Sequence, residues 1–331
     1  MPSLYLTQPG SRLELDAGRF VCLHRDELVL AVPSARVSQV VIVSGCHVTT
    51  PALLFMLDEG IDLLFVSATG AFRGRLDSGD VRNQALRREQ YRRSDDPAFC
   101  LETARAMLAG KLRNARTRCM ELDTENDPRD LDAIDRLRDA LAELARAPSL
   151  NALMLVEGRS ARAYFGVLRR HLREPWQFEK RMRRPPPDPV NALLSIAYTL
   201  LHEQCRSALI GAGLDPMCGF LHQPRAGRAS LALDLMEEFR PVIADAVAWT
   251  LLNKRMLTPA NSSRAHDDGV RLNPDGWKQF ARHFTRRLDT PILLPERATR
   301  TTYRKLIEIQ ARKLARVIQG TEERYEPYLA R

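Results

Sequence analysis

The sequence predicts an α+β protein in which a small N-terminal β-rich domain precedes a larger all-α C-terminal domain. Short β-branched and apolar runs, separated by turn residues, fill residues 1–48. Helical patterns with capping residues dominate from Val81 onward. The length of 331 residues suits roughly two domains of about 150 residues each. We therefore expect domains at residues 1–76 and 97–331, joined by a linker at residues 77–96.

The N-terminal part alternates between strand-like runs and turns. Turn residues separate the runs at Pro9-Gly10, at Asp16-Ala17-Gly18 and at Pro33-Ser34. A helix is expected to follow, with Thr50 as its N-cap, Pro51 at its first position and Gly60 just past its end. The predicted strands are Ser3–Leu6, Arg12–Leu15, Phe20–His24, Glu27–Val32, Val37–Val43, Ile61–Val66 and Phe72–Leu76.

The C-terminal part is expected to be helical almost to its end. Proline and capping residues set most of the boundaries, and Pro241 is expected to kink or restart the helix that begins at Ser230. The other predicted helices are Pro97–Leu122, residues 130–147, Leu150–Leu172 capped by Ser149, one containing Asn191–Leu201, one after Asn273-Pro274 and Arg300–Gln319.

Composition argues against several classes of protein. Hydrophobic content of 44% and charged content of 27% are those of a globular chain. No apolar run is long enough for a membrane span, and Met1–Gly10 lacks the pattern of a signal peptide. The six cysteines form no CxxC pair, which is typical of scattered reduced thiols. We expect a cytoplasmic protein that does not associate with membranes.

The net charge of +9 is unevenly distributed. Residues 1–76 carry a net charge of −1, so the excess of basic residues belongs entirely to the rest of the chain. Arginine outnumbers lysine 44 to 6, which suits recognition of phosphate by the guanidinium group. A GC-rich genome is an equally good explanation of this ratio.

Glu157 interrupts the apolar pattern of its predicted helix. It lies four residues after Leu153 and four before Ala161, on the same helical stripe. A buried carboxylate is costly unless it is paired or bound to a metal. The alternative is an ion pair with an arginine of the same helix, such as Arg159 or Arg162.

Two later segments also carry polar groups that can form a site. His222 lies in a loop containing glycine and proline, where it is either part of a site or a simple surface histidine. Asp234, Glu237 and Glu238 are spaced so that they share one helical face. The alternative for these three is a solvated acidic face.

Together these residues predict a metal site. Carboxylate oxygens suit Mg²⁺ or Mn²⁺, and an imidazole shifts the preference toward Mn²⁺. Residues 159–184 contain nine basic and two acidic residues. An acidic metal site beside a basic surface is typical of phosphodiester chemistry on nucleic acid.

The same segments resemble the CRISPR-associated integrase family, the adaptation proteins of CRISPR systems. Each motif is weak alone, but the order and spacing match over essentially the whole chain. The motifs are Thr49–Leu53 with Gly60-Ile61, Glu157–Phe165, Arg183–Ser195, Gly219–His222 and Asp234–Pro241.

The resemblance implies a β-rich domain followed by an all-α domain, a homodimer, and assembly with a small ferredoxin-like CRISPR adaptation subunit. It implies a metal-dependent DNA endonuclease and integrase that inserts captured double-stranded DNA fragments as spacers, by attack of a 3′-hydroxyl on the CRISPR repeat. Glu157, His222 and Glu237 would be the ligands of Mg²⁺ or Mn²⁺, and Asp234 would support catalysis. Glu238 is an alternative to Glu237.

In that mechanism, nearby basic and polar residues contact DNA. We expect Tyr164 either to line the pocket or to belong to the core. The expected DNA-contacting residues are Arg159, Arg162, Arg181, Arg183, Arg184, Asn191 and Tyr198. Two other functions fit the residues: a stand-alone metal-dependent repair nuclease acting on branched DNA, and a non-enzymatic DNA-binding scaffold.

Overall fold

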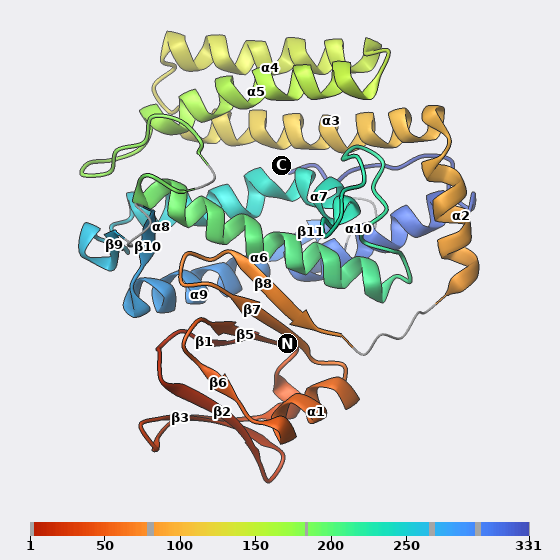
Figure 1. The fold of residues 1–331 in the computed structure, drawn as a ribbon. Helices are drawn as coiled ribbons and strands as arrows, with labels where there is room; N and C mark the ends of the chain where they lie inside the picture. The colour runs from red at the N-terminus through yellow and green to blue at the C-terminus, as the bar shows by residue number, and fades with distance from the viewer. Residues whose placement is uncertain (1–2, 78–82, 183–184, 265–268, 295–298, 331) are drawn as a thin grey trace. The chain divides into compact units, whose positions relative to one another are not determined.

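The computed structural model describes residues 3–77, 83–182, 185–264, 269–294 and 299–330. An N-terminal β-sheet region is followed by a mostly helical region, as the sequence predicts (Figure 1). The chain divides into two compact units. The first unit comprises Met1–Asp80, Met182–Thr199 and Thr250–Arg286. The second unit comprises the remaining segments, Val81–Arg181, Leu200–Trp249 and Arg287–Arg331. This division differs from the expected domains, because two later segments join the N-terminal region.

Two four-stranded sheets form the N-terminal region. One has the order β1-β5-β7-β8, with β8 antiparallel to β7 and the other pairs parallel; the other has the order β4-β3-β2-β6. All seven predicted strands are present, and only β6 was not predicted, because two residues are too few to show a pattern. The strands are β1 (Ser3–Leu6), β2 (Ser11–Asp16), β3 (Arg19–His24), β4 (Glu27–Pro33), β5 (Gln39–Val43), β6 (His47–Val48), β7 (Asp62–Val66) and β8 (Phe72–Leu76).

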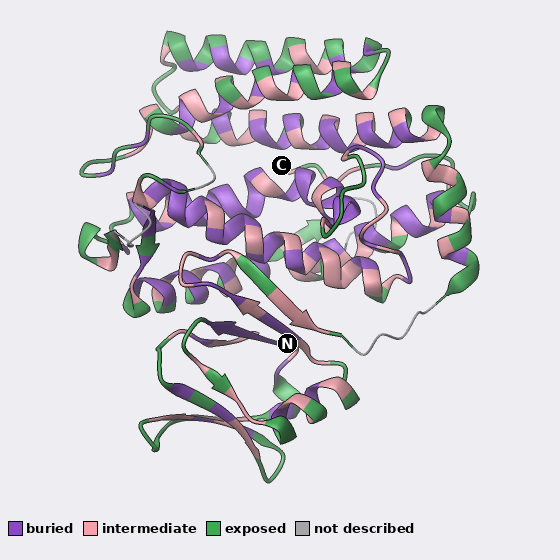
Figure 2. Ribbon diagram, viewed as in Figure 1, coloured by how far each residue is buried: buried purple, intermediate pink, exposed green. Residues whose placement is uncertain are grey.

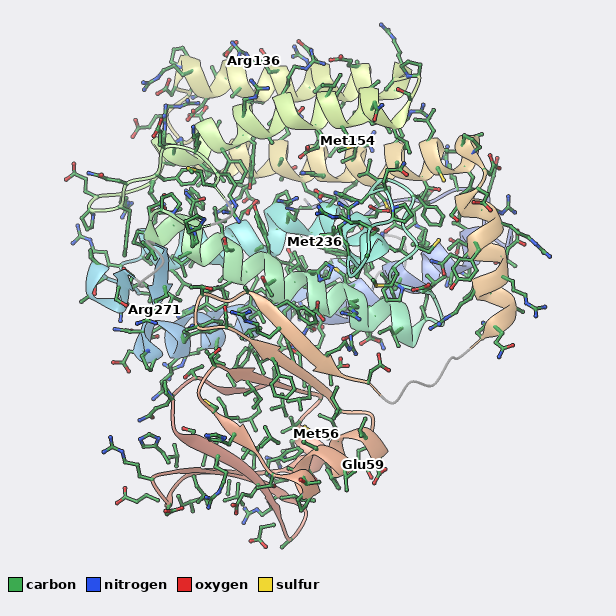
Figure 3. All side chains as sticks on the ribbon, viewed as in Figure 1. Met56, Glu59, Arg136, Met154, Met236 and Arg271 are labelled. Atoms are coloured by element: carbon green, nitrogen blue, oxygen red, sulfur yellow. The ribbon has the colours of Figure 1, made fainter. Side chains whose placement is uncertain are left out.

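Helix α1 (Thr50–Asp58) supplies part of the N-terminal core. Met56 is fully buried and belongs to the same hydrophobic cluster as Leu13 and Phe20, whereas Glu59 at the helix end is exposed (Figure 3). The expected N-cap was wrong by one residue. Thr49, with an extended backbone, holds that position, because Thr50 already has helical geometry.

The turn between β7 and β8 contacts the later segments of the first unit. Gly70 has a φ of +78°, and a Cβ placed there would lie 2.2 Å from Cγ1 of Ile196 in α6 (Pro189–Gly211). The indole Nε1 of Trp277 in α9 (Pro274–Leu288) donates to the carbonyl oxygen of Ala68 at 3.1 Å. These contacts explain why residues distant in sequence belong to one unit.

Replacing Gly70 by alanine is therefore expected to lower the free energy of unfolding by about 3 kcal/mol, because a positive φ and an overpacked contact both oppose the new methyl group. Gly60→Ala is the matched control. Gly60 has a φ of +64° but has nothing within 4 Å of the added Cβ, so its loss should be about 1 kcal/mol. Chemical denaturation measures both changes. Equal losses would contradict the predicted clash with Ile196.

Three long helices pack together in the second unit: α3 (Pro97–Leu122), α4 (Pro128–Arg146) and α5 (Leu150–Arg170). Asp96, Asp127 and Ser149 cap them through their side chains. The Asp127 cap starts α4 two residues earlier than expected. Buried residues line α3, while exposed residues such as Arg136 dominate the outer face of α4 (Figures 2 and 3).

Residues within the expected linker form a further helix, α2 (Gln84–Ser94). It begins where Oδ1 of Asn83 accepts a hydrogen bond from the amide of Leu86 at 3.1 Å. Its sequence is too polar to show an apolar stripe, and only Leu86 and Gln90 are buried. The amphipathic pattern used to predict helices was therefore weak here.

The helix beginning at Ser230 is interrupted, as Pro241 predicts. It runs as α7 (Ser230–Met236), a 3₁₀ turn at Glu237–Phe239, a π-helical segment at Arg240–Asp245 and α8 (Ala246–Asn253). Proline has no amide hydrogen to donate, so the regular hydrogen-bond ladder cannot continue through it. Such π-helical insertions often accompany functional sites.

The mostly helical region also contains two small antiparallel sheets that were not predicted. They pair β9 (Ser262–Arg264) with β10 (Val270–Leu272), and β11 (Pro291–Leu294) with β12 (Thr299–Thr302). The last helix, α10 (Tyr303–Ile318), therefore begins after the expected Arg300, with Thr302 as its cap. All six cysteines are free thiols. Within the described ranges, no helix is long and apolar enough to cross a membrane.

Candidate active site

Glu157 and Glu237 face one cation, the ammonium group of Lys111. Nζ of Lys111 lies 2.5 Å from Oε1 of Glu157 and 2.6 Å from Oε2 of Glu237. These side chains come from α5, from the 3₁₀ turn after α7 and from the middle of α3. All three elements belong to the second unit. The structure thus brings together two of the three predicted metal ligands.

Glu237 is buried among positive charges. Arg240 Nη1 lies 2.8 Å from its Oε1, whereas Lys111 contacts its other oxygen, Oε2. Burial alone raises the pKa of this carboxyl, but Arg240, Lys111 and His222 outweigh burial and lower its pKa to about 2. Glu237 is therefore an anion at neutral pH, and its surroundings stabilise that negative charge.

The third predicted ligand, His222, is oriented by Asp234. Nδ1 of His222 lies 2.6 Å from Oδ1 of Asp234, which is fully buried and also accepts the amide hydrogens of Phe220, Leu221 and His222 at 2.6–3.0 Å. Because the carboxylate only accepts, Nδ1 donates, and the lone pair of a neutral imidazole falls on Nε2. A carboxylate that fixes the outer nitrogen is the usual arrangement around metal-binding histidines.

The donor set fits a hard divalent cation. Two carboxylates and an imidazole are suitable ligands, and Oε2 of Glu237 is buried without a hydrogen bond of favourable geometry. However, the described residues contain no ready-made group of three His, Cys, Asp or Glu ligands. Lys111 holds the place between the carboxylates, so a metal ion would have to displace its ammonium group.

Glu238 occupies a separate, closed cluster. Its carboxylate accepts hydrogen bonds from the hydroxyl of Tyr325 at 2.7 Å, the amide of Tyr328 at 2.6 Å and Nε2 of Gln310 at 3.2 Å. Burial raises the pKa of Glu238 to about 7. Its donors hold it away from Lys111, so this geometry favours Glu237 over Glu238 as the ligand.

The simpler interpretations of these acidic residues are wrong. Asp234, Glu237 and Glu238 are all buried, so they do not form a solvated face. The partner of Glu157 is Lys111 of another helix rather than a nearby arginine of its own helix. Arg159 pairs instead with Glu143 at the surface, and Arg162 is exposed.

The residues expected to contact DNA lie in different environments. Arg159 and Arg162 are exposed on α5, while Arg181 is partly buried. Arg183 and Arg184 lie outside the described residues. Asn191 is fully buried, with its amide bonded to Asp188 and the main chain of Met182, so its contact with DNA stays a prediction. The hydrogen bonds of its side chain hold the residues at the start of α6.

Two tyrosines expected near the pocket are also largely buried. Of the two environments expected for Tyr164, the structure shows the core: the residue is 5% exposed, and its hydroxyl donates to Oδ2 of Asp245 at 3.0 Å. Tyr198 is 9% exposed and lies in the first unit, whereas Glu157, Glu237 and His222 lie in the second. A DNA contact by either tyrosine would require exposure that this conformation does not provide.

Sequence reasoning missed Lys111 and Arg240. Lys111 carried a signal, because it lies four residues after Met107 and four before Ala115, both buried on α3. It is also one of only six lysines in an arginine-rich chain. Arg240 carried a weaker signal, its position three residues after Glu237. Neither signal identifies the carboxylates that pair with these two cations. That pairing depends on how α3, α5 and the interrupted helix pack together.

The fold and site define a class of protein with an N-terminal β-sheet region and a mostly helical region that carries a buried carboxylate–imidazole cluster. The chain belongs to the family described as CRISPR associated protein Cas1, which matches residues 4–286.

Individual relatives agree with this assignment. The chain is 39% identical to CRISPR-associated endonuclease Cas1 3 of Thermus thermophilus, over 99% of this chain and 95% of that protein. Its fold resembles a casposase bound to integration product, with a TM-score of 0.88, 21% identity and coverage of 98% and 93% of the two chains. It also resembles a chain of a Cas6-RT-Cas1–Cas2 complex, with a TM-score of 0.83, 22% identity and coverage of 98% and 36%.

Proposed function

We propose that this protein is a divalent-metal-dependent DNA endonuclease and integrase that inserts captured DNA fragments as spacers into a CRISPR array. The observation that carries the proposal is the pair of carboxylates, Glu157 and Glu237, that face one cation at 2.5 and 2.6 Å. Family membership and the endonuclease name of its Thermus relative support this function. So does the likeness in fold to a casposase bound to integration product.

Glu157, His222 and Glu237 are the proposed ligands, and Mg²⁺ or Mn²⁺ is the proposed ion. When bound, the ion would neutralise charge on the scissile phosphate. Asp234 keeps the proton of His222 on Nδ1, so Nε2 remains available. Arg240 compensates the charge of Glu237 when Lys111 moves away.

The exposed arginines of α5 are the proposed contacts to the DNA backbone. Arg159 and Arg162 follow Glu157 on the same helix and are exposed. Contacts between arginine and phosphate hold the duplex without reading its sequence. Double-stranded DNA, both as the captured fragment and as the repeat, is therefore the proposed substrate.

The proposed assembly is a homodimer together with a Cas2-like, ferredoxin-like subunit. Strand β4 lies at the edge of its sheet and exposes Leu28, Val29 and Leu30, with exposures of 65%, 59% and 43%. An exposed apolar edge strand is a ready surface for pairing with another chain. This edge supports the homodimer, and the structural relative in a Cas1–Cas2 complex supports the second partner.

The proposed function is tested by strand joining to a supercoiled plasmid that carries a CRISPR repeat, in the presence of the Cas2-like partner. Joining should require Mg²⁺ or Mn²⁺, stop with EDTA and disappear in His222→Ala. His47→Ala, at an exposed histidine, should behave like the wild type. Metal-dependent cleavage without preference for the repeat would indicate a stand-alone nuclease. DNA binding without any strand chemistry would indicate a scaffold.

Replacing Lys111 by methionine is expected to reveal the metal site without measuring activity. With no cation between them, Glu157 and Glu237 repel one another, and the metal-free protein should lose about 3 kcal/mol of stability. Mn²⁺ should then raise the melting temperature more in this variant than in the wild type, because it no longer competes with an ammonium group. Differential scanning calorimetry measures both effects.

The control for this variant is Lys305→Met. Lys305 also forms an ion pair of 2.6 Å, with Glu308, but at the exposed surface of α10. Its loss should change stability by less than about 1 kcal/mol and should not alter the response to Mn²⁺. A response to Mn²⁺ in Lys111→Met no larger than in the wild type would count against the metal site.

A further inference from the structure

The segment Thr321–Ala330, here called the strap, contacts both elements that carry the Lys111–Glu237 ion pair. It follows α10 and contains Tyr325 and Tyr328, whose hydroxyl and amide groups donate to the carboxylate of Glu238 at 2.7 and 2.6 Å. Glu238 is the neighbour of Glu237 in the 3₁₀ turn. The strap therefore holds the residue beside a proposed metal ligand.

The strap is also joined to α3 on both sides of Lys111. Asn114, three residues after Lys111, donates through Nδ2 to the carbonyl oxygens of Glu238 and Tyr328 at 2.8 and 2.9 Å, and its Oδ1 accepts the amide of Ala330 at 2.8 Å. On the other side, a Cβ added at Gly110 would lie 2.5 Å from Cβ of Pro327. Asn114 thus links α3, the turn and the strap.

These contacts matter because the helix is interrupted where Glu237 lies. In a regular helix the hydrogen-bond ladder alone fixes the main chain. Here a 3₁₀ turn and a π-helical segment replace that ladder over Glu237–Asp245, and the side chain of Asn114 gives the carbonyl of Glu238 a partner from outside the helix. Removal of the strap would also leave the buried Glu238 carboxylate without the Tyr325 and Tyr328 donors, which is costly in a closed site.

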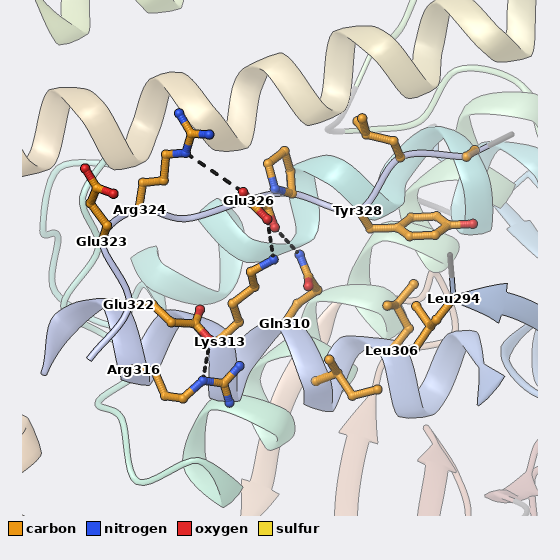
Figure 4. A pocket seen from close by; sticks show the side chains of 14 residues that line it. Leu294, Leu306, Gln310, Lys313, Arg316, Glu322, Glu323, Arg324, Glu326 and Tyr328 are labelled. Atoms are coloured by element: carbon orange, nitrogen blue, oxygen red, sulfur yellow. Dashed lines mark hydrogen bonds and ion pairs between the residues drawn. The ribbon is translucent and has the colours of Figure 1, made fainter. Parts of the chain in front are cut away.

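The strap is held at discrete points rather than by continuous burial. A pocket of 760 Å³ separates parts of it from α10, lined by charged side chains that include Lys313, Arg316 and Glu322. Figure 4 shows the ion pairs that cross this pocket, Lys313–Glu326 at 3.1 Å and Arg316–Glu322 at 2.6 Å. These ion pairs and the contacts with Glu238 and Asn114 are therefore the points that hold the strap.

We propose that the strap is a positioning element of the active site: by holding Glu238 and Asn114 it fixes the Glu237–Phe239 turn, and so the carboxylate of Glu237 against Lys111 and Glu157. Tyr325, Asn114 and Glu238 are positioning residues that act through Glu237. This inference rests on the proposed function only for its catalytic consequence, because the local ordering of the turn is independent of metal and DNA.

The test compares the full chain with a chain that lacks residues 322–331. In the shortened chain, the rate of amide hydrogen exchange, measured without metal, should rise at least tenfold in residues 236–245. It should stay unchanged in α4 and α5. Mn²⁺ affinity, measured by electron paramagnetic resonance, should fall about tenfold. In DNA cleavage, kcat should fall while KM for DNA stays the same. A peptide of residues 321–331 added in trans should restore all three properties.

Matched peptides separate positioning from unspecific binding. A peptide with Arg324→Ala should rescue as well as the natural sequence, because the Arg324 side chain is 70% exposed and does not touch Glu238. A peptide with Tyr325→Phe, which keeps the ring but lacks the donor to Glu238, should need at least a fivefold higher concentration. Equal rescue by both peptides would contradict the role of the Tyr325 hydroxyl.

Unchanged exchange in residues 236–245 after the deletion, or an equal rise throughout α3, α4 and α5, would overturn the proposal. If the shortened chain does not fold, Tyr325→Phe in the full chain decides: a rise confined to residues 236–245 supports positioning, and no rise overturns it. If wild-type protein binds Mn²⁺ without dependence on Glu157, the proposed function fails, while the exchange result still decides the role of the strap.

Discussion

Replacing Glu157 by glutamine is expected to lower strand joining and DNA cleavage by about 10³-fold while leaving the fold intact. The amide keeps the shape of the side chain but removes the negative charge that the proposed ion needs. A loss of several kcal/mol of transition-state stabilisation corresponds to this factor. The Glu157 side chain is 29% exposed, and Lys111 keeps its pair with Glu237. Stability should therefore change by less than about 1 kcal/mol.

Single-turnover cleavage, circular dichroism and DNA-binding measurements together check this prediction. Glu237→Gln is the informative comparison: it should also abolish activity, but it should cost about 3–5 kcal/mol of stability, because it removes the buried negative charge that faces both Arg240 and Lys111. If Glu157→Gln retained more than a tenth of wild-type activity, Glu157 would not be a metal ligand.

The variant Asp234→Asn is expected to weaken Mn²⁺ binding by about 10–100-fold and to reduce stability by about 3 kcal/mol. Every partner of the Asp234 carboxylate is a donor: the amides of Phe220, Leu221 and His222, and Nδ1 of His222. The NH₂ group of asparagine must face at least one of them. If it faces His222, the ring proton moves to Nε2, and the nitrogen needed for the metal is lost.

Calorimetric titration with Mn²⁺ and nitrogen-15 spectra of the His222 ring measure these two effects. Asp215→Asn is the control, because Asp215 also accepts an amide hydrogen, from Met217 at 2.9 Å, and the hydroxyl of Tyr91 at 2.8 Å, without contacting His222. It should lose stability but keep its Mn²⁺ affinity. A change of ring tautomer without any change in affinity would exclude His222 as a ligand.

Local sequence signals predicted most of the fold. Helix α3 begins and ends at the predicted residues, and its start follows from Pro97, which suits the first turn of a helix, and from the Asp96 cap. The strand runs of the N-terminal part were equally clear, because glycine or proline turns separate most of them; the exception is the Arg25-Asp26 turn between β3 and β4. The errors have local causes: α2 is nearly all polar, β6 has two residues, and β12 overlaps the start of the helix expected from Arg300.

The sequence predicted which residues belong to the candidate site, but not which of them contact one another. Glu157, His222, Asp234 and Glu237 were chosen because they interrupt apolar patterns or resemble family motifs, and the structure places Glu157 with Glu237 and Asp234 with His222. Glu238 looked equivalent to Glu237 in sequence. Its separate environment follows from hydrogen bonds with Gln310 and Tyr325, more than 70 residues away in the chain.

The sequence by itself determined most of the strands and helices, the break at Pro241 and the residue types of the site, because all of these depend on neighbours within a few positions. Only the tertiary structure decided that Lys111 lies between the two carboxylates, that Asn191 is buried, and that the strap reaches back to Glu238. The physical reason is that the energy of a buried charge depends on which partners surround it. Those partners come from elements that only packing brings together.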